Sequence, residues 1–160
     1  MKKQIAKKFL LGFSLIETIL VMTIVLLLLS MVGLSVTENN NESEIVKQEA
    51  NELVVWLSDK MNQAKLEEAD FKIYASEWSA GNLQLTVSWL TGPNATKSVS
   101  YKTDKVYLRK ESSSYQFTYD GKWQSLSPAV TFTVRGKSLS QKNIIEVTVS
   151  GVGYVSTKVK

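Results

Sequence analysis

The chain has 160 residues, contains no Cys and no His, and carries a formal net charge of +4. Without these two residue types it has no disulfides, no thiolate metal site and no hydrolytic centre of the Ser-His-Asp or Cys-His kind. We therefore expect a protein that is not an enzyme, with no catalytic residue, no metal and no cofactor. The charge is divided unevenly: residues 38–79 hold ten acids and four bases, and residues 80–160 hold four acids and eleven bases.

The chain begins with a basic leader and continues into a long apolar run. Lys2, Lys3, Lys7 and Lys8 precede Gly12, and residues 13–34 contain Glu17 as their only ionisable group. As a helix this run is about 33 Å long at about 1.5 Å per residue, which is enough to span a bilayer. Because basic residues precede the run and acidic ones follow it, the expected orientation is N-terminus in and C-terminus out.

Three interpretations account for this segment: an ordinary secretory signal, a plain uncleaved anchor, and a processed assembly helix. The hexapeptide GFSLIE (residues 12–17) in front of the apolar run resembles the type III signal of the type IV pilin and pseudopilin superfamily. The resemblance implies that prepilin peptidase cleaves between Gly12 and Phe13 and that Phe13 becomes N-methylated. It also implies that Glu17 serves filament assembly.

The position of Glu17 has a physical cost that assembly removes. A carboxylate inside a bilayer costs about 2.5–3.5 kcal/mol on insertion scales. In a bundle of such helices the N-terminal amine of a neighbouring subunit can lie beside Glu17 and neutralise it, which also sets the axial register between subunits. The cost of burying Glu17 is therefore offset when other subunits pack beside it.

The next segment is predicted to be helical with one apolar face. Residues 37–43 are polar and form either a loosened helical turn or a short linker. From residue 44 the apolar residues recur at helical spacing: Val46, Ala50, Leu53, Leu57, Met61 and Ala64, with Val54 and Trp56 widening the face. We expect this stripe to pack on the chain's own sheet, the alternative being a surface for a partner helix. The acidic residues around it (Asp59, Glu67, Glu68, Asp70) are interpreted as solvated.

Beyond Ala69 the pattern changes to the alternation of β-strands. Asp120-Gly121 predicts a hairpin with a type I′ turn, and residues 150–153 (SGVG) predict the last hairpin turn. The expected strands are 83–89, 99–103, 106–109, 115–119, 130–135, 144–149 and 154–159.

The expected fold class is α+β and type IV pilin-like. It has a long N-terminal helix, with a transmembrane half and a soluble half, packed on an antiparallel β domain. The expected segments are a leader (1–12), a transmembrane and assembly helix (13–36), the soluble half of the helix with a connector (37–79), and the β domain (80–160). The layout of the helix end and the closing hairpin resembles GspH/FimT-type minor pilins and the ComGD-type competence pseudopilin.

This resemblance implies a structural subunit of a filament in a type II secretion, type IV pilus or competence (DNA-uptake) machine. The implied partners are other pilins or pseudopilins, prepilin peptidase, an inner-membrane assembly platform and membrane lipid. The implied location is the cytoplasmic membrane as a single-pass protein with its globular domain outside, and then the filament on the cell surface or in the envelope. A major pilus subunit and a filament-tip DNA-binding module remain alternatives.

The DNA-binding alternative depends on basic residues of the β domain. Some FimT-type pilins are DNA receptors with a Gly-Arg-x-Arg pattern, but here Gly153 is followed by Tyr154, Val155 and Ser156, so both Arg positions are replaced. A looser basic set with interleaved aromatics remains and could contact phosphates and stack on bases. Lysines that protect strand edges are the competing interpretation. The candidate DNA contacts are Arg109, Lys110, Arg135, Lys137, Lys158 and Lys160.

Overall fold

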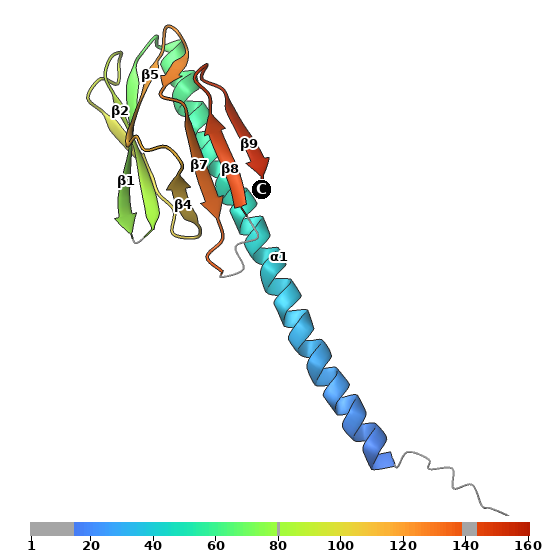
Figure 1. Cartoon of the computed structure of the whole chain (residues 1–160). Helices are drawn as coiled ribbons and strands as arrows, with labels where there is room; N and C mark the ends of the chain where they lie inside the picture. The colour runs from blue at the N-terminus through green and yellow to red at the C-terminus, as the bar shows by residue number, and fades with distance from the viewer. Residues whose placement is uncertain (1–14, 80, 139–143) are drawn as a thin grey trace, which may run out of the picture. The chain divides into compact units, whose positions relative to one another are not determined.

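The computed structural model describes residues 15–79, 81–138 and 144–160, with side chains at 16–29 and from 41 onward. These residues form one helix and nine strands (Figure 1). The chain divides into two compact units, Met1–Asn39 and Asn40–Lys160, which are described separately. The elements are α1 (Leu15–Leu66), β1 (Phe71–Ser79), β2 (Asn82–Trp89), β3 (Ser98–Tyr101), β4 (Tyr107–Lys110), β5 (Gln116–Asp120), β6 (Ser125–Ser127), β7 (Val130–Arg135), β8 (Ile144–Val149) and β9 (Val155–Val159).

In the first unit, α1 begins at Leu15 and carries Glu17 in its first turn. Every side chain that the structure describes from Ile16 to Leu29 is exposed. Among the described residues, no helix combines the length and the apolar character that a membrane crossing needs. The predicted processing residues Gly12 and Phe13 lie outside the described residues.

The second unit contains two antiparallel sheets. The strand order is β3-β2-β1-β5-β6 in the five-stranded sheet and β4-β7-β8-β9 in the four-stranded sheet. All neighbouring strands within each sheet run antiparallel. The expected α+β class with a helix and an antiparallel β domain is confirmed.

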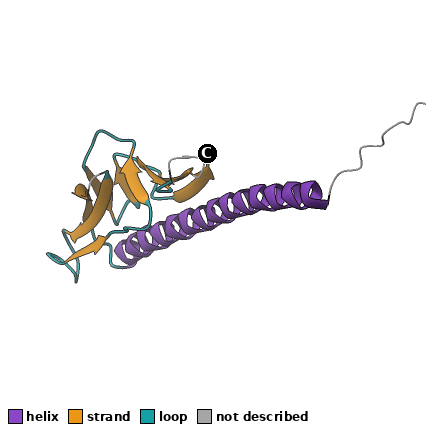
Figure 2. Cartoon of the chain, turned by 90° about the horizontal axis from the view of Figure 1, so that it is seen from below, coloured by secondary structure: helices purple, strands orange, loops and turns teal. Residues whose placement is uncertain are grey.

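The predicted apolar stripe of α1 belongs to the core of this unit. The side chains of Val46, Ala50, Leu53, Leu57, Met61 and Ala64 are at most 4% exposed. They join one cluster with the inward-facing side chains of both sheets, and Val54 and Trp56 pack at its margin. Figure 2 shows this end of the helix lying along the strands. The stripe therefore packs on the chain's own sheets, as predicted.

Two strands are absent from the sequence-based expectations. β1 occupies part of the segment assigned to a connector and pairs with both β2 and β5. Its side chains alternate between buried and exposed only from Phe71 to Ala75, and the remainder of the strand is exposed, so its periodicity is short. β6 has three residues with Leu126 as its single apolar member, which is too little for a period-two pattern.

The two predicted hairpins are present, but one uses a different turn. β8 and β9 are joined through Gly153, which has a φ of 66°, as expected for the closing turn. Between β5 and β6, Asp120 pairs with Ser125, so the connection has four residues and the predicted type I′ turn is wrong. Gly121 is not in the left-handed region there, whereas Gln124 is, with a φ of 50°.

Candidate functional site

The predicted assembly residue lies at the start of an apolar helical surface. Glu17 is exposed in the single chain, and the large apolar side chains from Ile16 to Leu29 are between 44% and 77% exposed. An exposed apolar surface of this extent marks a site of contact with protein or lipid. The residues that form it are Ile16, Ile19, Leu20, Val21, Met22, Ile24, Val25, Leu26, Leu27, Leu28 and Leu29.

Four of the candidate DNA contacts have side chains on the outer side of the four-stranded sheet, and that of Arg109, on the edge strand β4, also lines the pocket beside Gly81. We call Arg109, Arg135, Lys158 and Lys160 the basic face. Because side chains alternate along a strand, residues next to the buried Leu108 and Val134 point outward. The register then aligns Arg109 with Thr133, and Glu146 with Lys158. Lys160 follows β9 and reaches Glu146 on the same face.

The basic face is partly neutralised by its own neighbours. Lys160 Nζ lies 2.6 Å from Glu146 Oε1 and 3.9 Å from Glu111 Oε1. The hydrogen bond from Lys160 holds the pKa of Glu146 below its ordinary value, and the same bond raises the pKa of Lys160. The Arg135 guanidinium stands 5.5 Å from the centre of the Tyr107 ring. The surface therefore mixes cations with carboxylates.

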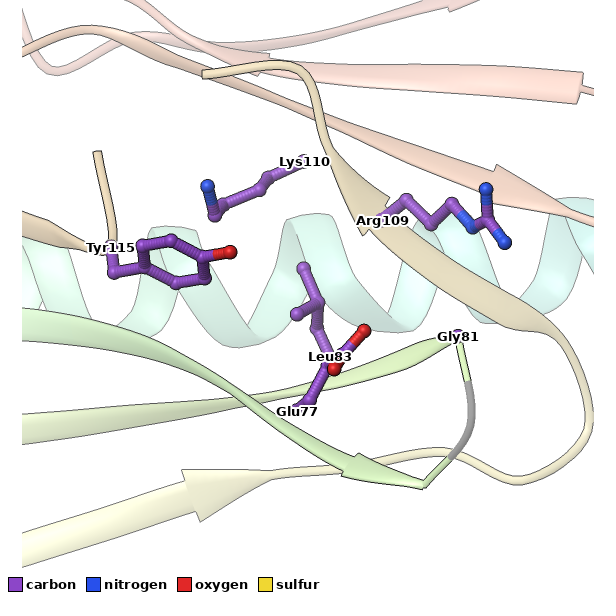
Figure 3. Close-up of a pocket in the computed structure, with 6 residues that line it drawn as sticks. All are labelled: Glu77, Gly81, Leu83, Arg109, Lys110 and Tyr115. Carbon is purple, nitrogen blue, oxygen red and sulfur yellow. The ribbon is translucent and has the colours of Figure 1, made fainter. Parts of the chain in front are cut away.

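The other two candidate DNA contacts lie elsewhere. Lys110 points away from Arg109 and toward Tyr115, in a pocket of about 290 Å³ (Figure 3). Its Nζ is 3.6 Å from the centre of the Tyr115 ring and donates a hydrogen bond to the Ser112 carbonyl oxygen at 2.5 Å. The carboxylate of Glu77 lines the same pocket. Lys137 is exposed beyond the end of β7.

The structure contains a groove beside α1 that the sequence analysis does not identify. It has a volume of about 830 Å³, and its centre is apolar, with Val55 67% exposed. The rings of Trp56 and Tyr101 lie 5.5 Å apart at 41°. We call it the acidic groove, because it contains two carboxylates and no Lys or Arg. Its lining residues are Gln48, Asn51, Glu52, Val55, Trp56, Asp59 and Tyr101.

A buried carboxylate fixes one wall of this groove. Glu49 is 3% exposed, and its Oε1 lies 2.8 Å from Lys105 Nζ. The Tyr101 hydroxyl donates to the Glu49 carbonyl oxygen at 3.4 Å and contacts its Oε2 at 3.5 Å. Burial, followed by the charges of Glu49 and Glu52, raises the pKa of Tyr101 far above its ordinary value. The hydrogen bond to Glu49 also raises the pKa of Lys105.

A sequence signal for Glu49 does exist. It lies three residues after Val46 and four before Leu53, so helical spacing places it on the apolar stripe. A carboxylate on such a stripe needs a cationic partner. The pattern does not reveal that this partner is Lys105, because the two residues are brought together by the packing of β3 on α1.

The chain has the type IV pilin fold seen in a solved minor pilin. Two crystal structures of the type IV minor pilin FimU of Pseudomonas aeruginosa (strain PAO1) superpose on it. In one, the TM-score is 0.57 at 15% identity, covering 74% of this chain and 95% of FimU. In the other, the TM-score is 0.55 at 16% identity, covering 71% and 96%. No protein-family model and no curated protein sequence matches the chain.

Proposed function

We propose that this chain is a minor pilin or pseudopilin, a structural subunit that assembles through its N-terminal helix into a type IV pilus-like filament. One combination carries the proposal: the sequence GFSLIE in front of an apolar run, in a chain that has a pilin-like fold. The role is structural, not enzymatic. The filament belongs to a type II secretion system, a type IV pilus or a competence machine, since the same signal serves subunits of all three.

The proposed route of the chain into the filament has three steps. Residues 13–36 first hold it in the cytoplasmic membrane with its N-terminus inside and its globular part outside. Prepilin peptidase then cleaves the chain after Gly12 and removes the leader. The same enzyme methylates the new N-terminal amine of Phe13. An assembly platform in the same membrane then passes the subunit into the filament. There Glu17 lies beside the Phe13 amine of a neighbour, and the pair neutralises both charges inside the helix bundle.

Mass spectrometry of the membrane-extracted protein tests this proposal. We expect a chain that begins with N-methylated Phe13, and Gly12→Val should retain the leader because the peptidase reads the small residue. A conservative change outside the signal, Lys3→Arg, serves as the control and should be processed normally. An extracted chain that still begins at Met1 would contradict the proposal.

Two alternatives are separated by further measurements. A major subunit would dominate the mass of purified filaments, whereas a minor pilin is a small fraction of it, so quantitative mass spectrometry of filaments distinguishes them. A DNA-binding tip module is favoured by Arg109, Arg135 and Lys158, whose side chains lie on the outer side of the same sheet. The pairing of Lys160 with Glu146 opposes it, because it reduces the charge available to phosphates.

Fluorescence anisotropy with a labelled DNA duplex tests the DNA-binding alternative. The soluble part, residues 38–160, is titrated at two salt concentrations. Because phosphate binding releases counterions, true binding must weaken steeply as salt rises. We expect no salt-dependent binding at micromolar protein. Binding that falls with salt and is lost in Arg109→Glu would favour the DNA module instead.

A further inference from the structure

We propose that the acidic groove is a docking site for an extended segment of a different filament subunit, which pairs with the free edge of β3. On the side of this segment that faces the groove, an apolar residue covers Val55, and a Lys or Arg two residues away lies beside Glu52. The inference rests on the proposed function as a minor subunit, whose neighbours in the filament are other kinds of pilin. Four observations support it.

The first observation is the balance of charge in the groove. Asp59 already pairs with Lys60 at 2.8 Å, and the buried carboxylate of the groove wall is paired as well. Glu52 accepts a hydrogen bond from Gln48 at 3.0 Å, and no Lys or Arg in the described part of the chain forms an ion pair with it. Glu52 is therefore the charge that a partner can neutralise, so a cation on the partner fits the groove and a phosphate does not.

The second observation is that the edge of the five-stranded sheet leaves apolar side chains uncovered beside the groove. Val99 and Tyr101 of β3 pair with buried residues of β2, so their side chains lie on the inner side of the sheet. Val99 is nevertheless 41% exposed, and Val55, which lines the groove from α1, is 67% exposed. An apolar side chain of a partner would remove these surfaces from water and extend the core beyond β3.

The third observation is the free edge of β3. This strand contributes Tyr101 to the groove and is the outermost strand of its sheet, with β2 on its other side. Such an edge presents backbone N–H and C=O groups that an extended segment of another chain can pair with. Because neighbouring strands lie about 4.8 Å apart, an added strand would place its inward side chains next to the side of α1 that lines the groove.

The fourth observation is a match in spacing. Glu52 and Val55 are three residues apart on α1, and Cβ atoms at this helical separation lie about 5–6 Å apart. In an extended segment, side chains two residues apart point to the same side and are about 7 Å apart along the strand. A segment with an apolar and a basic residue two apart therefore reaches both positions at once. Adjacent residues point to opposite sides, so only one of them can enter the groove.

Disulfide capture of short peptides tests this chemistry on the full-length chain, which has no native cysteine. The variant Asn51→Cys places a thiol in the groove. Two peptides of the same composition compete for it: CGGTKTVT, in which Lys and Val are two residues apart, and CGGTTKVT, in which they are adjacent. Intact-mass spectrometry should find the first peptide captured about fivefold more often, because only this peptide places its cation and its apolar side chain in the groove together. Ser113→Cys, at an exposed loop position, is the matched control and should capture both peptides equally. Equal capture by Asn51→Cys overturns the proposal.

Two further measurements separate the charge contact from the strand pairing. Adding Glu52→Lys should abolish the preference for CGGTKTVT, and the acidic peptide CGGTETVT should then be preferred, because the attractive contact is restored with its signs exchanged. Thermal unfolding verifies that this variant keeps its fold. In the first peptide, the N–H groups of Lys and Val point to one side of the strand and those of the flanking Thr residues to the other. N-methylation of one of these two sets should abolish capture, and N-methylation of the other should not. A preference that survives Glu52→Lys, or equal effects of the two methylations, overturns the proposal.

Photo-cross-linking in filaments and membranes tests the identity of the occupant. The Asn51→Cys thiol is labelled with a photoactivatable maleimide, and the cross-linked peptides are sequenced by mass spectrometry. We expect a link to a segment of a different pilin that has an apolar and a basic residue two apart. A link to a second copy of this chain, to lipid, or to a segment without this pattern overturns the proposal.

The same preparations separate this inference from the function on which it rests. Intact-mass spectrometry reads whether the chain has been cleaved after Gly12. A processed chain that captures the two peptides equally overturns the docking and leaves the proposed function standing. An unprocessed chain that prefers CGGTKTVT overturns the proposed function and supports the docking.

Discussion

The carboxylate of Glu49 and the ammonium of Lys105 lie 2.8 Å apart and join α1 to the connection between β3 and β4. The two ends of this pair differ: the Glu49 side chain is 3% exposed, and that of Lys105 is 56% exposed. Removing the exposed partner leaves a buried charge, whereas removing the buried partner leaves a cation that water can solvate. The two deletions therefore have unequal costs.

We expect Lys105→Ala to destabilise the protein more than Glu49→Gln. Glu49→Gln should lower the free energy of unfolding by about 1.5–3 kcal/mol, the usual range for losing a hydrogen bond to a charged group. Lys105→Ala should lower it by more than this, because an uncompensated carboxylate stays buried. Urea unfolding followed by Trp fluorescence measures both, and Lys47→Ala, an exposed position on α1, is the control. Equal losses for the two variants would contradict this asymmetry.

A buried amide ties β2 to the segment that leads into β4. The Asn82 side chain donates to the carbonyl oxygens of Thr103 at 2.7 Å and Val106 at 3.0 Å. Its Oδ1 accepts from Leu108 N–H at 2.8 Å. Asn82→Ala leaves three buried backbone groups without partners, at about 1–3 kcal/mol each. We expect a loss of at least about 3 kcal/mol in urea unfolding, against a change within about 0.5 kcal/mol for Gln84→Ala on the outer side of β2.

Gly121 is needed for a close approach of two backbones. A Cβ built at this position would lie 2.8 Å from the carbonyl oxygen of Ala64 and closer still to the backbone of Ala69. Its N–H donates to Asp70 Oδ1 at 3.0 Å, so the loop cannot move away without losing this bond. Gly121→Ala should therefore lower the melting temperature sharply, whereas Gly151→Ala, with its nearest atom 3.7 Å away, should be tolerated. Similar melting temperatures for the two variants would refute the close-approach argument.

The example of Gly121 shows what the sequence predicts and what it does not. The Asp-Gly pair correctly predicts a hairpin, because both residues favour tight turns. The physical reason for the glycine is different: Gly121 leaves room for the backbone at the end of α1, which is far from it in the sequence. The helix, its apolar face, and strands β7 and β8 follow from local periodicity. β1 does not, because only Phe71, Ile73 and Ala75 carry the alternation.

The candidate interaction surfaces differ in how far the sequence alone predicts them. The motif around Glu17 is contiguous in the sequence, so it can be read directly. The acidic groove combines helical positions 48–59 with Tyr101 from β3, and their meeting depends on tertiary packing. The basic residues were visible as a set. Only the strand register and the packing show that Lys110 lies in the Tyr115 pocket, which Arg109 also lines, and that Arg135 and Lys158 lie on the outer side of the sheet.

The ion pair of Glu146 and Lys160 makes the stability of the fold depend on pH. Its hydrogen bond to Lys160 holds the pKa of Glu146 below the ordinary value. A carboxyl group with a lowered folded-state pKa stabilises the fold above its unfolded pKa, and this contribution is lost as the pH falls through the folded value. The melting temperature of the wild type should therefore fall from pH 7 to pH 3 by more than that of Glu146→Gln. Parallel curves for the two proteins would contradict this role.

The prediction for Glu17 concerns assembly into the filament and not the stability of the single chain. Glu17→Leu removes the charge from an apolar helical surface and should favour the membrane-inserted subunit, so that the chain is made and cleaved after Gly12 as before. It should enter filaments poorly beside wild-type partners, because the Phe13 amine of the neighbour then has no carboxylate in the helix bundle. Quantitative mass spectrometry of sheared filaments and of membranes separates the two effects. Thr18→Val, a neighbouring neutral change, is the control. Normal incorporation of Glu17→Leu would show that register is set by apolar packing alone, and the assembly role of this residue would then be lost.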